Sequence, residues 1–105
     1  MASIPVVAKR LKEARLRAGL SQKRLGIKAG IDQFAASARI NQYERAKHHP
    51  DVLTVQRLAK VLEVPSPFFY AQDDLLAAWI LVFDRVRPSV RKSVLRKANL
   101  RQVTL

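Results

Sequence analysis

The chain has 105 residues, 49% of them hydrophobic, and carries 20 Lys and Arg against 8 Asp and Glu, for a formal charge of +12. This length suits one modest hydrophobic core, and the hydrophobic content excludes a disordered tail. A field of that size attracts polyanions, although a basic protein whose lysines are merely solvated has the same composition. The absence of cysteine excludes disulfides and cysteine-based zinc sites.

The chain shows no pattern that directs it to a membrane. Residues 1–8 are apolar but lack the basic leader and full apolar stretch of a signal peptide. The longest apolar run, residues 75–83, falls well short of the about 20 residues that a membrane span requires. We therefore expect a soluble, cytoplasmic protein.

Glycine and proline residues divide the chain into short helical segments, and no stretch alternates apolar and polar residues as a strand does. Ser21, Asp51 and either Asp73 or Asp74 are placed to cap helices. Helices are predicted at about residues 5–18, 22–29, 37–45, 52–62 and 74–83, with a helical turn at 66–69 and a last helix that begins at Pro88. The sequence therefore predicts an all-α protein.

Two glycines and two apolar residues indicate how the second and third predicted helices meet. A side chain at Gly26 would point into the crossing between these helices, so only a small residue lets them approach closely at a steep angle. Gly30 lies just past the second helix, where a left-handed backbone is required. Ile40 and Tyr43 share one face of the third helix and can hold it against the core. This arrangement is typical of a helix-turn-helix.

With these features the sequence resembles the lambda-repressor-like, or XRE-type, helix-turn-helix family. The resemblance covers about residues 5–70, and 36–45 resembles a bacterial subgroup of small regulators with a lengthened turn. The matching positions are Leu11, Arg15, residues 19–22, Leu25, residues 29–31, Ile40, residues 43–45, Pro50, residues 58–60 and residues 62–65. The resemblance implies a five-helix DNA-binding domain at 5–70, followed by an additional C-terminal helical extension at 71–105.

The sequence departs from the family pattern at three places. About four extra residues separate Gly30 from Ile40, which makes the start of the third helix uncertain by two or three residues. Ala46 stands where a helix-ending glycine is common. Lys23 and Arg24 replace an acidic pair, which adds positive charge near the start of the second helix.

Members of this family lay the third helix in the major groove of duplex DNA, with its N-terminal residues at the base edges. Arg39 is then placed to bind guanine, Asn41 or Gln42 to bind adenine, and Ala38 to contact a thymine methyl. The expected base-reading residues are Ser37, Ala38, Arg39, Asn41 and Gln42. The alternative is that these are solvated residues of a helix that only packs on the core.

A second set of residues is expected to bind phosphates and so to position the protein without reading sequence. The start of the second helix can hold a phosphate through its backbone N–H groups, helped by the helix dipole. The expected phosphate-binding residues are Arg10, Ser21, Gln22, Lys23, Arg45, Lys47 and His48. For any one of them an ordinary exposed charge is the alternative.

No pattern of catalytic or metal-binding residues stands out. His48 and His49 are adjacent and point apart, with no third ligand nearby, so no metal site is expected. Ser89 and Lys92 have the Ser-x-x-Lys spacing of penicillin-binding enzymes, but the companion motifs are missing. We expect no enzyme activity, no cofactor and no small-molecule substrate.

The C-terminal third contains a helix that is apolar all round. Such a helix needs cover on several sides, and Leu76, Trp79, Ile80 and Phe83 are expected to contact a partner, most simply a second copy. The alternative is full packing inside the monomer. The chain from Arg85 onward carries seven basic residues and no acids, and the sequence does not decide between a DNA contact, an anionic partner and a solvated face.

The leading hypothesis is a homodimeric, sequence-specific regulator of transcription, a repressor rather than an activator, that binds double-stranded DNA. Its two half-sites would lie about 34 Å apart, one turn of duplex, or a small multiple of that distance. One alternative is an antitoxin-like or accessory protein whose C-terminal helices bind another protein. Another is an RNA-binding or nucleoid protein that binds mainly through charge.

Overall fold

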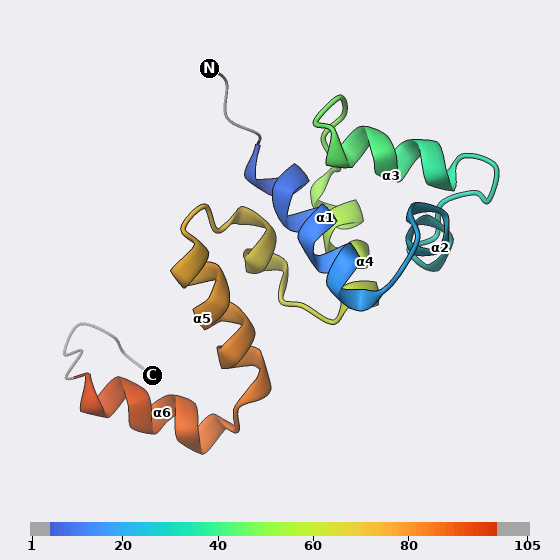
Figure 1. Cartoon of the computed structure of the whole chain (residues 1–105). Coiled ribbons are helices and arrows are strands. Elements are labelled where there is room, and N and C mark those ends of the chain that lie inside the picture. The colour runs from blue at the N-terminus through green and yellow to red at the C-terminus, as the bar shows by residue number, and fades with distance from the viewer. Residues whose placement is uncertain (1–4, 99–105) are drawn as a thin grey trace.

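The computed structural model describes residues 5–98, and within this range it contains helices and no strand (Figure 1). The all-α class predicted from the sequence is confirmed. Its elements are α1 (Val6–Ala18), α2 (Gln22–Lys28), α3 (Ala36–Glu44), α4 (Val52–Leu62), the 3-10 helix η1 (Ser66–Tyr70), α5 (Asp74–Arg85) and α6 (Pro88–Lys97).

Local signals in the sequence explain where most helices begin and end. The Ser21 hydroxyl accepts a hydrogen bond from the Arg24 N–H at 3.0 Å, and Asp51 accepts one from the Thr54 N–H at 2.7 Å. Asp73, one of two candidates, caps α5 by accepting bonds from Leu75 and Leu76. These caps satisfy backbone N–H groups that have no partner within the first turn of a helix.

One hydrophobic core joins α1, α2, α3, α4 and η1. Its fully buried side chains include Leu11, Leu25, Ile40, Leu58 and Phe68, one from each element. Phe68 and Phe69 meet edge to face, with ring centroids 5.7 Å apart. Each helix therefore buries one apolar stripe against the others. The Ile40 side of α3 packs on the core, which leaves the opposite side of this helix at the surface.

Arg10 corrects the sequence analysis, which assigned it to a phosphate. The residue is 1% exposed, and its Nε atom donates to the Ala71 carbonyl at 2.8 Å. Its two terminal nitrogens bind Glu13 and Asp74, and the guanidinium lies 5.7 Å from the Phe68 ring. With its donors directed inward, Arg10 ties α1 to the start of α5 and cannot bind DNA.

The last two helices are much less covered than the first four. On α5 only Ala77 is buried, where the helix meets η1, and α6 has no buried residue. Figure 1 shows α5 and α6 as a splayed pair on the opposite side of the molecule from α3. The alternative of an α5 fully packed inside the monomer is therefore wrong. Among residues 5–98, no helix is both long and apolar enough to span a membrane.

Candidate nucleic-acid interface

The crossing of α2 and α3 depends on Gly26. A Cβ atom built on Gly26 would lie 2.7 Å from the Cβ of Ala36 and 3.0 Å from its Cα, closer than side chains tolerate. Gly26 is buried, and it meets the first residue of α3. The close approach predicted from the sequence is therefore present, and Ala36 is the small residue on the opposite side of it.

The lengthened turn between the two helices has a defined conformation. Gly30 adopts φ +91°, a left-handed backbone in which a substitution is strained. The Asp32 carboxylate then accepts a hydrogen bond from the Phe34 N–H at 3.0 Å, and its carbonyl accepts one from the Ala35 N–H at 3.0 Å. These bonds form a compact turn that leads into α3 at Ala36, one residue before the predicted start.

The exposed side of α3 carries the residues expected to read bases. Because Ala36, Ile40, Tyr43 and Glu44 are buried, helical geometry places the opposite side along a row of other positions. That row consists of Ala38, Asn41, Gln42 and Arg45, with Ser37 and Arg39 at its two margins. Ser37, Ala38 and Arg39 are exposed, and Asn41 and Gln42 are half-buried.

A polar network behind this row holds Asn41 in place. The Gln22 side-chain nitrogen donates to the Asn41 oxygen at 3.2 Å and to Glu44 at 3.1 Å. Glu44 is 9% exposed and also binds the Arg15 guanidinium, so the network reaches α1. With both amide hydrogens used, the Gln22 side chain positions Asn41, so a phosphate contact at Gln22 stays a prediction only for its backbone N–H group.

Sequence reasoning missed the roles of Arg15 and Glu44. Arg15 also donates to the Leu20 carbonyl at 3.0 Å, so one side chain joins α1, the α1–α2 turn and α3. Both residues lie among the positions that match the family pattern. The signal available in the sequence was therefore their joint presence, since spacing alone does not pair residues so far apart.

The remaining phosphate candidates stay on the surface. Ser21, Lys23, Arg45, Lys47 and His48 are all exposed. Ala46 adopts φ 59°, so the departure from the usual glycine leaves the left-handed end of α3 in place. The Lys47 and His48 N–H groups donate to the Gln42 carbonyl at 2.9 and 3.4 Å, which turns the chain back at the C-terminal end of this exposed row.

The described part of the chain contains no group of three side chains that could hold a metal ion. His48 and His49 are both exposed and lie in the segment after α3. Of the seven basic residues from Arg85 onward, one, Arg101, lies outside the described residues.

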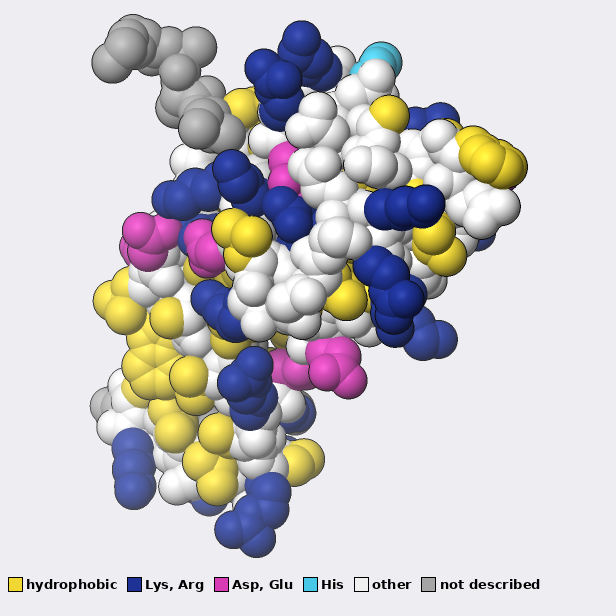
Figure 2. All heavy atoms as spheres, turned by 45° about the vertical axis from the view of Figure 1, so that its right-hand side comes forward, with side chains coloured by type: hydrophobic (Ala, Val, Ile, Leu, Met, Phe, Trp, Pro, Cys, Tyr) yellow, Lys and Arg dark blue, Asp and Glu magenta, His cyan; other side chains and the backbone are white. Residues whose placement is uncertain are grey.

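Three of the four residues expected to contact a partner are exposed. Leu76, Trp79 and Phe83 are 51%, 55% and 55% exposed, whereas Ile80 is half-buried and packs partly against the core. Figure 2 shows hydrophobic side chains gathered over the lower part of the molecule, where α5 and α6 lie, with Lys and Arg at the margins.

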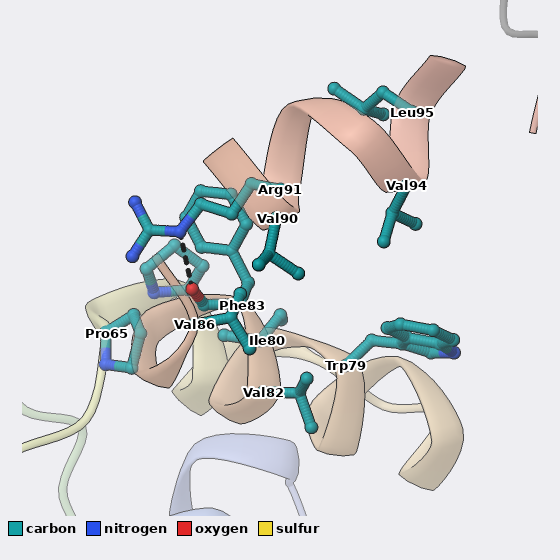
Figure 3. Close-up of a pocket in the computed structure, with 11 residues that line it drawn as sticks. Pro65, Trp79, Ile80, Val82, Phe83, Val86, Val90, Arg91, Val94 and Leu95 are labelled. Carbon is teal, nitrogen blue, oxygen red and sulfur yellow. Dashed lines mark hydrogen bonds between the residues drawn. The ribbon is translucent and has the colours of Figure 1, made fainter. Parts of the chain in front are cut away.

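An apolar hollow of about 450 Å³ opens between α5 and α6. Figure 3 shows Val90 and Val94 pointing from α6 towards α5, with Trp79 at the other side of the space. Arg91, the charged residue among those that line the hollow, stacks 4.2 Å from the Phe83 ring centroid and donates to the Phe83 carbonyl at 2.7 Å. The hollow therefore presents hydrocarbon to the outside.

Comparisons with known proteins agree with this geometry. A family model described as helix-turn-helix matches residues 11–69. The crystal structure of the transcriptional regulator BswR is similar, with a TM-score of 0.82 and 47% sequence identity over 88% of this chain and 91% of that chain. The comparison with curated proteins gives no match. With more than half of its length matched by the family model, the chain belongs to the XRE-type helix-turn-helix family of DNA-binding proteins.

Proposed function

We propose that the protein is a homodimeric, sequence-specific regulator of transcription that acts as a repressor by occupying its operator. The observation that carries this proposal is the exposed row on α3, in which Asn41 is held by Gln22 and faces outward beside Gln42. Such amides bind adenine through paired donor and acceptor groups in the major groove. The similarity to BswR, a transcriptional regulator, supports the regulatory role.

The charges around this row suit a DNA backbone. Lys23 precedes it on α2, Arg45 lies at its C-terminal end and Lys47 follows it, all three exposed. With a formal charge of +12 on the whole chain, each phosphate contact would release counterions and make binding weaker in salt. A basic surface alone binds any sequence, so the arranged amides are what favour a specific reader over a nucleoid protein.

The apolar face of α5 and α6 supports the homodimer. Soluble monomers rarely expose a continuous apolar area of this kind, and a two-fold axis lets one face cover its copy. Leu76, Trp79 and Phe83 on α5 and Val94 on α6 would then meet their equivalents. Two reading helices joined in this way bind two half-sites, which suits operators with two-fold symmetry.

The same face favours a second candidate function, an accessory protein whose α5 and α6 bind a different polypeptide. An antitoxin-like protein of this type would use its DNA binding to control its own gene. The two candidates differ in solution, since the first predicts a stable dimer of the chain alone and the second predicts a monomer.

One experiment tests the function directly. The whole protein is incubated with random duplex DNA, bound sequences are selected and read, and the mass of the free protein is measured by sedimentation. A defined motif with two related halves and twice the monomer mass are expected. Enrichment of no motif, with equal loss of binding to every competitor DNA, would refute sequence-specific reading.

A further inference from the structure

Phe34 is the most exposed large hydrophobic residue of the described chain, at 88%. It lies in the turn between α2 and α3, two residues before α3 begins at Ala36. The exposed apolar residues of α5 share one face, whereas the residues directly before Phe34 in the turn, Asp32 and Gln33, are polar and exposed. A single exposed ring is ordinary on a protein surface, so the place of Phe34, directly before the helix expected to read bases, is what gives it significance.

The turn presents the ring in a fixed place. Asp32 binds the backbone N–H groups of both Phe34 and Ala35, each at 3.0 Å, and Gly30 and Gly26 fix the approach to the turn from α2. The backbone of the turn therefore needs little ordering when it meets a partner, which favours binding. Figure 1 shows this loop projecting beyond the end of α3, away from the α1–α4 bundle.

The position of the turn points to the major groove. In this docking mode the N-terminal residues of the reading helix lie closest to the base edges, and the turn directly precedes them. The apolar group that the major groove offers is the C5-methyl of thymine, and phenylalanine is among the side chains that contact it. The charged phosphates offer no comparable surface to an aromatic ring.

We propose that Phe34 is a specificity-determining residue that contacts a thymine methyl group next to the bases read by α3. This inference rests on the proposed function and adds a base position to it. The extra residues of the turn would thus extend the reading surface beyond the helix. The recognised sequence would contain a thymine at the outer edge of each half-site that α3 itself does not reach.

Replacement of thymine by uracil tests the contact, because uracil lacks only the methyl group. Each thymine of one selected half-site is replaced in turn, and affinity is measured for the wild type, Phe34→Ala and Phe34→Leu. For the wild type, one replacement at the outer edge should weaken binding about fourfold, the effect of one buried methyl-sized group. Phe34→Ala should bind the thymine duplex and the duplex with uracil at that outer position equally, and Phe34→Leu should keep part of the difference at that position.

Gln33→Ala is the matched control, since Gln33 is exposed in the same turn and carries no ring. It should show the wild-type response to every uracil. The melting temperatures of all variants should match, because Phe34 and Gln33 are exposed. A uracil response in Phe34→Ala identical to that of the wild type would overturn the proposal while leaving sequence-specific binding intact. A wild type that selects no motif would instead refute the proposed function itself.

Discussion

The α1–η1 region and the α5–α6 pair differ in how much of their apolar surface is covered within the chain. The first region closes on itself, with Leu11, Leu25, Ile40, Leu58 and Phe68 at 0–1% exposure. The second leaves Trp79 and Phe83 more than half exposed and buries no residue of α6. The first region covers its apolar side chains within one chain, whereas the second leaves them uncovered.

Polar groups differ between the regions in the same way. In the first, Arg10, Arg15 and Glu44 are buried or nearly so and bound, and no buried side-chain nitrogen or oxygen in the described residues lacks a partner. Satisfied buried polar groups of this kind hold one arrangement of the helices. In the second, Arg91 lines the apolar hollow and stacks on the exposed Phe83 ring. The contrast fits the proposed division of roles, in which a fixed surface would read DNA and an uncovered one would join two copies.

Breaking the apolar face should have the largest effect. Because Trp79 is 55% exposed, Trp79→Glu should leave the fold of the monomer intact but place a charge in the proposed dimer contact. We expect the sedimentation mass to fall to that of one chain. Affinity for a duplex with two half-sites should fall by about 10²–10⁴, the usual gain from joining two binding units, while affinity for a single half-site stays the same.

Gln56→Glu is the matched control, since it introduces the same charge at an exposed residue of α4 that does not line the hollow. It should keep the wild-type mass. A Trp79→Glu protein that still sediments as a dimer would place the contact between copies elsewhere.

Breaking the closed region should have the next largest effect. Gly26→Leu forces a side chain into the 2.7 Å approach to Ala36, and overpacking of this kind destabilises a core by about 3 kcal/mol. In Gly30→Ala the new Cβ would have no atom within 4 Å, so only the strain of the left-handed backbone should destabilise the fold, by about 1–2 kcal/mol. Urea unfolding measures the loss in free energy of unfolding for each variant, and equal losses would contradict the close crossing of α2 and α3.

Within the closed region, the reading and positioning residues should respond differently. Arg39→Ala should relax the preference at one base pair by about 1–3 kcal/mol, because the exposed Arg39 side chain at the margin of the α3 row is the one expected to bind guanine. Lys47→Ala should weaken all sequences alike and lower the salt slope by about 1. Affinities for a panel of single-base variants, measured at several salt concentrations, separate the two. Equal loss on every sequence would remove Arg39 from the base readers.

The parts of this comparison that the sequence could predict are those that depend on near neighbours. The caps at Ser21 and Asp51 depend on groups three residues away, and Gly26 and Gly30 carry their own steric reasons. Helical periodicity likewise identified Ile40 and Tyr43 as inward-facing, and both are buried. The start of α3 was off by one residue, because the conformation of the extra turn depends on the Asp32 side chain.

The parts that the sequence could not predict depend on partners that are distant along the chain. Arg10 looked like a surface charge, and its burial follows from the Ala71 carbonyl and the Asp74 carboxylate. Gln22 looked like a phosphate donor, and its amide is used by Asn41 and Glu44. In both cases the residue type is polar in either role, so only the fold decides which group it meets.

The smallest expected effect concerns Asp74, whose carboxylate joins the two regions. Hydrogen bonds from Arg10 and Lys9 lower the pKa of Asp74 below its ordinary value of 3.8. The ionised carboxylate therefore stabilises the folded chain fully above that value, and this contribution is lost as the pH falls through the lowered pKa. Because the Asp74 side chain is 77% exposed, water screens the pair and the contribution is small.

Asp74→Asn tests this bond between the regions. Above pH 5 the variant should unfold at a slightly lower urea concentration than the wild type, and the difference should close as the pH falls below 3.8. Asp51→Asn is the control, since the Thr54 hydrogen bonds also lower the pKa of Asp51 but act only on the start of α4. Only Asp74→Asn should make α5 more accessible to protease at neutral pH. Equal protection of α5 in both variants would show that η1 alone holds α5 in place, and that the charged contact joins the regions without restraining them.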